Sequence, residues 1–236
     1  MSKKMLPQEV LKLIACVTMF IDHFGHVIVP GLSVSYMAGL YYACRIIGRI
    51  AFPIYAFLLC EGMRHTRNPQ NYILRLGAGI LLAELPFDIL FEGGISWASQ
   101  SVMVTLTLGA LMILCLQKAE QKWMKLLIVL LFCVLADLAR SDYGGWGIAM
   151  IAVFAVFDRL PEIALGILLI NAVMPFGVIP FFGLNLSVQT FGAVAMVPIS
   201  LYSGRKLTHN RALQWVFYLF YPVHMLILWM ILLILR

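Results

Sequence analysis

Long apolar runs are the feature that most constrains how this chain can fold. The runs from Leu126 to Leu135 and from Leu226 to Leu235 contain no charged residue and no alternation of apolar with polar side chains. Of the 236 residues, 62% are hydrophobic and 12% are charged, against roughly a quarter charged in an ordinary soluble domain. We therefore expect an all-α, polytopic bundle of transmembrane helices.

The length of the chain limits the number of membrane spans to about nine or ten, because each helix needs about 20 residues to cross the hydrocarbon core. The sixth and seventh expected spans are short, and Pro175 and Pro180 interrupt the apolar stretch after the seventh, so we expect one of these segments to be re-entrant or tilted. We expect a single domain over residues 1–236, embedded in the lipid bilayer. The apolar runs predict nine spans, at about 9–29, 38–62, 71–91, 100–117, 123–140, 145–157, 161–175, 187–202 and 212–235.

Basic residues are distributed unevenly between the expected loops. If the N-terminus is cytoplasmic, most lysines and arginines lie at cytoplasmic ends, and the outer loops hold Arg140 and Arg236. An excess of Lys and Arg is typical of cytoplasmic loops. We therefore expect a multi-pass cell-membrane protein with a cytoplasmic N-terminus and an extracytoplasmic C-terminus. This topology accounts for the formal net charge of +6, so we expect no nucleic-acid partner.

Ionisable side chains recur inside the expected spans, although each costs at least about 2.5 kcal/mol there. Arg45 and Arg49 lie four residues apart on the second span, and Glu84 and Asp88 repeat that spacing on the third. Residues at this spacing share one helix face, and the two spans are expected to be antiparallel, so either arginine could pair with either carboxylate. Taken singly, Arg45, Glu84, Asp88 and Asp137 are better explained by a structural ion network.

The first span carries Asp22 and His23 past its midpoint, with His26 one turn beyond His23. Adjacent helical residues point about 100° apart, so Asp22 and His23 need different partners. This makes a purely structural ion network a poorer explanation for them. The placement of Asp22, His26 and Arg45 in the outer half of the membrane favours a substrate that enters from outside.

The last span carries Tyr218, Tyr221 and His224 near its middle, with Pro222 between them. A proline inside a helix removes a hydrogen bond and predicts a kink. Histidine can act as a general base near neutral pH, and a carboxylate can orient it. The chain has no HExxH motif, which is typical of zinc peptidases, so we expect no catalytic metal.

At these residues the sequence resembles the TraX family of bacterial inner-membrane proteins. The resemblance covers both ends of the chain and most of the first 90 residues. Residues 95–200 contribute little beyond hydropathy. The segments that carry it are Leu11 to His23, Arg45 to Phe57 with Glu61 and Gly62, Glu84 to Asp88, and Tyr218 to His224.

The chain also resembles, more distantly, the integral-membrane acyltransferases of the acyltransferase-3 type. Those enzymes carry a basic residue and a histidine eleven positions apart on their first span, and Lys12 and His23 have this spacing. The spacing alone arises by chance in many chains. Its position on the first span, with the basic residue at the cytoplasmic end, makes it informative.

The resemblance implies transfer of an acetyl group from acetyl-CoA, because the namesake of the TraX family acetylates the N-terminus of pilin subunits. His23, oriented by Asp22 or another carboxylate, would deprotonate the acceptor, and Arg45 or Arg49 would stabilise the oxyanion. His224 would line the same cavity with His26, Glu84, Asp88, Tyr218 and Tyr221. The phosphates of acetyl-CoA would lie on a basic cytoplasmic face formed by Lys12, Arg64, Arg67, Arg75, Arg205, Lys206 and Arg211.

Several alternatives stay open at this point. Any single basic residue of this face is better explained by topology alone. The acceptor could be a pilin-like protein, an envelope glycan or a lipid. A transporter or flippase would use the buried charges as a proton relay, although we find no internal repeat of the kind common in transporters. A membrane scaffold without catalysis would not need Asp22, His23 and His224 near mid-bilayer.

Overall fold

The chain is predominantly helical in a computed structural model, which describes residues 5–32, 37–175, 177–181, 184–208 and 210–235. This confirms the expected helical class. The chain forms two compact units: unit 1 comprises residues 1–55 and 164–236, and unit 2 comprises residues 56–163. Both chain ends therefore belong to unit 1. The expectation of a single domain stays a prediction.

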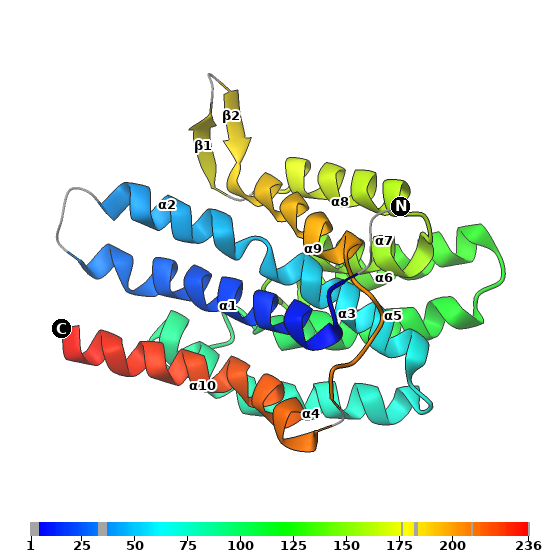
Figure 1. Cartoon of the computed structure of the whole chain (residues 1–236), viewed down its shortest axis with the longest axis horizontal. Coiled ribbons are helices and arrows are strands. Elements are labelled where there is room, and N and C mark those ends of the chain that lie inside the picture. The colour runs from blue at the N-terminus through cyan, green and yellow to red at the C-terminus, as the bar shows by residue number, and fades with distance from the viewer. Residues whose placement is uncertain (1–4, 33–36, 176, 182–183, 209, 236) are drawn as a thin grey trace. The chain divides into compact units, whose positions relative to one another are not determined.

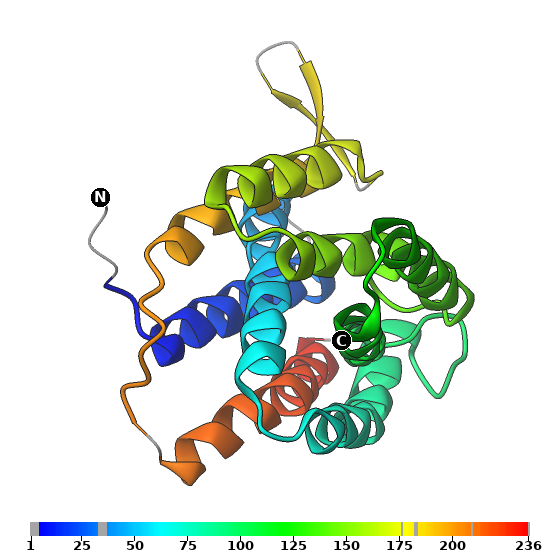
Figure 2. The same ribbon diagram turned by 90° about the vertical axis from the view of Figure 1, so that its right-hand side faces the viewer.

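Unit 1 is built around the helix α1 (Gln8–Val27), which packs against α2 (Met37–Gly48) and α10 (Arg211–Leu235). Figures 1 and 2 show α1 running between these two helices. The 3₁₀ helix η3 (Val188–Ala195) packs against α2 and continues into the short helix α9 (Met196–Ser200). The connection 201–208 is hydrogen-bonded to the start of α1, with Leu6 and Gln8 donating to the carbonyls of Leu201 and Arg205 over 2.9 Å each.

Glycines allow α1 and α2 to approach closely. A Cβ atom added at Gly25 of α1 would overlap Cys44 of α2, and one added at Gly48 of α2 would overlap the side chain of Asp22. Small residues at such positions are typical of helix pairs in membranes, since they let backbones come into contact. The Asp22 carboxylate therefore lies directly against the end of α2.

Unit 2 contains four helices in succession: α4 (Pro69–Phe87), α5 (Val102–Lys118), α6 (Lys122–Leu138) and α7 (Gly144–Val156). Each packs against the next, and α5 also packs against α7. A π-helical turn, η2 (Asp88–Glu92), extends α4. Helices α3 (Ala51–His65) and α8 (Leu160–Val173) each contribute residues to both units.

The prediction of nine spans is not supported, although each predicted span coincides with helical structure. Among the described residues, three helical segments are long and apolar enough to cross a membrane: Gln8–Gly31, Met37–His65 and Ala212–Leu235. Four further apolar helical segments have 10–17 residues, fewer than the roughly 20 that a perpendicular span requires. Runs of apolar residues therefore mark where helices lie better than how long the helices are.

A β-hairpin follows the seventh expected span, in the stretch that contains Pro180. Strands β1 (Val178–Phe181) and β2 (Leu184–Ser187) pair antiparallel and project from unit 1 after α8 (Figures 1 and 2). Pro175 ends the helical stretch because proline cannot continue it, and Val178 and Ile179 favour an extended backbone. The chain is thus helical with one small two-stranded sheet among its described residues.

The surface of α10 matches the expectation of lipid contact. Exposed apolar patches of this extent are unusual on soluble monomers and mark contact with membranes or partners. The three long apolar helices likewise indicate membrane association. The large apolar side chains exposed along α10 are Trp215, Val216, Leu219, Val223, Leu226, Ile227, Met230, Leu233, Ile234 and Leu235.

Candidate functional site

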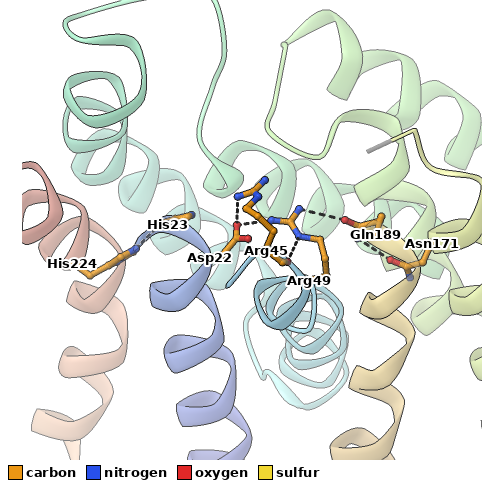
Figure 3. Close-up of polar contacts among 7 residues, drawn as sticks. All are labelled: Asp22, His23, Arg45, Arg49, Asn171, Gln189 and His224. Carbon is orange, nitrogen blue, oxygen red and sulfur yellow. Dashed lines mark hydrogen bonds and ion pairs between the residues drawn. The ribbon is translucent and has the colours of Figure 1, made fainter. Parts of the chain in front are cut away.

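His23 and His224 form a hydrogen-bonded pair in unit 1. His23 Nδ1 on α1 lies 2.8 Å from His224 Nε2 on α10, and the two rings are nearly parallel, 17° apart. His224 is buried, whereas His23 is partly exposed. Figure 3 shows the pair on the side of α1 that faces α10. The two histidines predicted to share a site are therefore in direct contact.

The hydrogen bonds of His224 determine the tautomers of both neutral rings. His224 Nδ1 lies 2.7 Å from the carbonyl oxygen of Phe220, and a carbonyl oxygen accepts only, so Nδ1 must carry the proton. His224 Nε2 is then the acceptor, and His23 Nδ1 donates to it. His23 Nε2 is left as the basic nitrogen of the pair.

Aromatic rings surround this pair. The rings of Phe220 and His224 stack with centroids 4.8 Å apart, and Phe20 and Tyr221 contact His224 edge-on at 6.3 and 5.7 Å. The Tyr221 ring also lies 6.4 Å from that of His23. These rings lower the local dielectric, which strengthens every electrostatic interaction of the pair.

Asp22 binds both predicted arginines on another face of α1. Its Oδ2 accepts hydrogen bonds from Arg45 over 2.9 Å and from Arg49 over 2.5 Å, and all three side chains are buried. Arg49 follows α2 directly and also donates from Nε to the carbonyl oxygen of Arg45 over 3.2 Å. Asp22 or another carboxylate was expected to orient His23, and the partner seen at His23 Nδ1 is His224.

A chain of amides continues from Arg49 (Figure 3). Arg49 donates to Gln189 Oε1 over 3.3 Å, and Gln189 Nε2 donates to Asn171 Oδ1 over 2.8 Å. Asn171 Nδ2 in turn donates to the Ile167 carbonyl over 2.7 Å. Both amide side chains are fully buried, so η3 and α8 support the arginine from the side opposite Asp22.

Comparison with known proteins supplies the family. The family model described as TraX protein matches residues 7–232. The chain belongs to the TraX family. It is also similar, at 28% identity over 234 residues, to a protein of Dichelobacter nodosus named probable fimbrial assembly protein FimC, serogroup H1, with 92% of each chain covered. No solved structure matches the chain.

The basic residues predicted to bind acetyl-CoA are divided between the two units of this TraX family member. Lys12 lies 5.4 Å above the Phe217 ring, and the backbone hydrogen bonds of segment 201–208 hold Arg205 and Lys206 at the same end of α1. The side chain of Arg211 lies outside the described residues. In unit 2, Arg64 donates to the Phe154 carbonyl over 2.7 Å, while Arg67 and Arg75 are exposed.

Glu84 and Asp88 have structural partners within unit 2. Glu84 accepts hydrogen bonds from the backbone nitrogen and the hydroxyl of Ser101, over 3.0 and 2.8 Å. Asp88 accepts one from the Ser96 nitrogen over 3.1 Å. These bonds tie the end of α4 to the start of α5, which favours the structural interpretation of both carboxylates. Their pairing with Arg45 or Arg49 stays a prediction.

Asp137 also has a structural partner. It accepts a hydrogen bond from the Gly145 nitrogen over 2.7 Å, so it stabilises the start of α7. Gly144 adopts φ +49° there, a backbone conformation that favours glycine.

The remaining predicted residues differ in their surroundings. Tyr221 contacts both histidines, whereas Tyr218 is exposed and contacts Trp215, with ring centroids 6.3 Å apart. His26 lies one turn beyond Asp22 on α1 and is exposed. The structure therefore adds Tyr221 to the immediate surroundings of the histidine pair and shows no comparable contact for Tyr218.

Sequence reasoning missed Gln189 and Asn171. Both side chains are neutral, so the cost of burying charge in an apolar stretch did not single them out. A neutral amide inside an apolar helix also costs free energy unless it is hydrogen-bonded. That cost was the signal available for both residues in the sequence.

Proposed function

We propose that this protein is an integral-membrane acetyltransferase, in which His23 is the general base and cytoplasmic acetyl-CoA is the acyl donor. The observation that supports this most directly is the hydrogen-bonded series from His23 through His224 to the Phe220 carbonyl. The series fixes the basic nitrogen at His23 Nε2. Acyl transfer needs such a base next to groups that stabilise negative charge.

The reaction follows from these groups. His23 Nε2 takes the proton of an acceptor hydroxyl or amine as its oxygen or nitrogen attacks the thioester carbonyl. The tetrahedral intermediate carries an oxyanion, which a guanidinium of Arg45 or Arg49 stabilises. Collapse of the intermediate breaks the carbon–sulfur bond, and the CoA thiolate receives the proton from His23. The products are the acetylated acceptor and free CoA, and no metal is required.

His224 has the role that a carboxylate has in many catalytic triads. It accepts from His23 Nδ1 and thereby orients the ring. When His23 gains the proton at Nε2, the Nδ1–H bond to His224 strengthens because the donor is now charged. The Phe220 carbonyl stabilises positive charge that is shared with His224.

Basic residues at the start of α1 are proposed to hold the donor. Lys12, Arg205 and Lys206 lie at one end of unit 1, and guanidinium and ammonium groups bind phosphates well. Eleven residues of helix separate Lys12 from His23, about 16 Å along the axis. An extended pantetheine arm would have to bridge this distance. The relation to acyltransferase-3 enzymes stays a prediction.

The acceptor is proposed to be a pilin-like protein or an envelope glycan. The similar Dichelobacter nodosus protein bears the name of a fimbrial assembly protein, which supports a pilin-like acceptor. We also propose a multi-pass topology in the cell membrane, with a cytoplasmic N-terminus that places Lys12 on the side where acetyl-CoA is made available.

Release of free CoA thiol from acetyl-CoA by the purified protein in detergent tests the proposal. We expect slow release by the wild type, since water can replace the acceptor, and loss of at least a hundredfold in His23→Ala. His65→Ala is the matched control, because His65 is exposed and contacts the carbonyl and carboxylate of Glu61, one turn earlier in the same helix. Acetyl-CoA binding is measured on the same samples.

The transporter alternative gives a different result. Folded wild-type protein that neither binds acetyl-CoA nor releases thiol would contradict the acetyltransferase and favour a transporter. Equal thiol release by the wild type and His23→Ala would keep the reaction class but remove His23 as its base.

A further inference from the structure

One face of α1 connects the two ends of the proposed site. Lys12, Cys16 and His23 point within about 40° of one another around the helix axis, because each residue turns by about 100°. The α10 side chains that contact this face are Phe217 at Lys12 and Tyr221 at His23. Cys16 therefore lies between the proposed phosphate-binding lysine and the proposed base.

A polar group from a third helix reaches this face of α1 at Cys16. The Tyr55 hydroxyl on α3 lies 3.2 Å from the Cys16 thiol, which is buried, whereas Tyr55 is partly exposed. Among the described residues, this thiol is the hydrogen-bond partner of the hydroxyl. A thiol is a weak partner, and a phenol offers one donor and acceptor positions as well, whereas a buried tyrosine hydroxyl usually has a strong partner. The Tyr55 hydroxyl therefore retains capacity to bind a ligand that reaches it.

The spacing along α1 matches the spacing of polar groups in pantetheine. At about 1.5 Å per residue, Cys16 lies about 10 Å before His23 and about 6 Å beyond Lys12. An extended chain advances about 1.2 Å per bond, since three backbone bonds span at most about 3.6 Å. The carbonyl of the outer amide, which is the amide farther from the sulfur, is eight bonds from the thioester sulfur, about 10 Å, and the first phosphorus is thirteen bonds away, about 16 Å. With the thioester at His23, the outer amide lies level with Cys16 and the phosphates lie level with Lys12.

We propose that Tyr55 binds the outer amide of the donor's pantetheine arm and thereby sets how far the thioester reaches along α1. This inference rests on the proposed function. A buried amide needs a hydrogen-bond partner, because an unpaired amide in an apolar environment costs free energy. The Tyr55 hydroxyl can donate to the amide carbonyl oxygen and still accept from the Cys16 thiol. Tyr55 thus contributes binding of pantetheine thioesters rather than chemistry.

Three donors of decreasing length separate the contributions along α1. Acetyl-CoA has the phosphates and both amides, S-acetylpantetheine has both amides without a phosphate, and N,S-diacetylcysteamine has the inner amide alone. Tyr55→Phe removes the hydroxyl, and we expect it to raise KM about threefold to tenfold for the first two donors with kcat unchanged. For N,S-diacetylcysteamine, KM should stay at the wild-type value. Release of free thiol by the purified protein in detergent measures all three reactions.

Two further substitutions provide references at either end of the arm. Lys12→Met should raise KM about tenfold for acetyl-CoA alone, since the other two donors carry no phosphate. His23→Ala should lower kcat for all three donors. Tyr42→Phe is the matched control, because Tyr42 is exposed on α2 and contacts the ring of Tyr41. This control should match the wild type with every donor.

Substitution of Cys16 distinguishes ligand binding from structural support. Cys16→Ala breaks the same hydrogen bond but leaves the Tyr55 hydroxyl to the ligand, so KM for acetyl-CoA should stay at or below the wild-type value. An equal rise of KM in Cys16→Ala and Tyr55→Phe would overturn the inference. So would a Tyr55→Phe variant with the wild-type KM for S-acetylpantetheine, or one with an equal rise of KM for N,S-diacetylcysteamine, which does not reach Tyr55.

Binding measurements keep the two proposals distinguishable. Affinity for pantetheine is measured on the same samples, because it needs no turnover. If the wild type releases no thiol, weaker binding of pantetheine by Tyr55→Phe still supports the inference, and equal binding overturns it. If the folded wild type binds neither acetyl-CoA nor pantetheine, both proposals have failed. If the wild type is active and Tyr55→Phe has the wild-type KM for every donor, the proposed function stands and the assignment of Tyr55 has failed.

Discussion

At the scale of single residues, the proposed catalysis depends on which nitrogen of which histidine is basic. The Phe220 carbonyl fixes the proton on His224 Nδ1, and His224 fixes the proton on His23 Nδ1. The Phe220 carbonyl oxygen on α10 thereby determines which ring nitrogen of His23, on α1, carries the proton. His224 does not need to touch the reacting atoms, because its effect is exerted through His23.

Substitution of His224 tests this role. His224→Gln retains an acceptor that can orient His23 Nδ1–H, whereas His224→Ala removes it. We expect His224→Gln to keep more of the wild-type kcat than His224→Ala, with losses of about tenfold and about a thousandfold respectively. The measurement is steady-state thiol release at saturating acetyl-CoA. Equal kcat values for the two variants would show that orientation of His23 by position 224 is unimportant.

At the scale of secondary-structure elements, the close contact between α1 and α2 brings the cluster together. Gly48 lies where the Asp22 side chain passes the end of α2, and Arg45 and Arg49 flank it in sequence. A larger residue at position 48 must push α1 away from α2 or displace Asp22. Either change separates the carboxylate from the two guanidinium groups.

Alanine substitutions of two glycines in α2 test this packing. Gly48→Ala should lower stability by about 1–3 kcal/mol, as overpacking does, and reduce thiol release because Asp22 is displaced. Gly39→Ala is the matched control: Gly39 is in the same helix with no atom within 4 Å of an added Cβ, so alanine should leave stability unchanged or raise it slightly. The measurement is thermal unfolding in detergent. Equal unfolding temperatures of the two variants would contradict the close approach.

The sequence predicted the helices better than their lengths, and the charged site residues better than the neutral ones. Asp22, His23, Arg45, Arg49 and His224 were identified because charge within an apolar helix is costly. Their pairing depends on which helices are neighbours, and hydropathy carries no information on that. The hairpin after α8 was missed for a related reason, since its apolar residues fit a buried helix as well as a strand.

At the scale of the whole molecule, the apolar sequence predicts a protein that crosses the membrane many times. The helices of the structure support membrane association but not the predicted number of crossings. Three segments of the described chain are long and apolar enough to span, and nine crossings are not supported. An odd number of crossings from a cytoplasmic N-terminus places the C-terminus outside. Either three or nine crossings satisfies this condition.

Alkaline phosphatase fusions test the topology, because the enzyme is active only outside the cytoplasm. We expect high phosphatase activity for a fusion at the C-terminus and none for a fusion after Lys118, which lies at the C-terminal end of α5. A third fusion after Arg140 reports whether α5 and α6 add crossings. An inactive fusion at the C-terminus would contradict the proposed orientation.

The most direct test of the central claim is transfer of a labelled acetyl group in membrane vesicles that contain the protein and its native acceptors. Vesicles with the wild type are incubated with isotopically labelled acetyl-CoA, and protein and glycan fractions are analysed by mass spectrometry. We predict label on a pilin-like protein or an envelope glycan in wild-type and His65→Ala vesicles, and none in His23→Ala vesicles. The same labelled products in His23→Ala vesicles would contradict acetyl transfer by the His23–His224 pair. So would the absence of label from every fraction when the wild type is folded and releases CoA thiol.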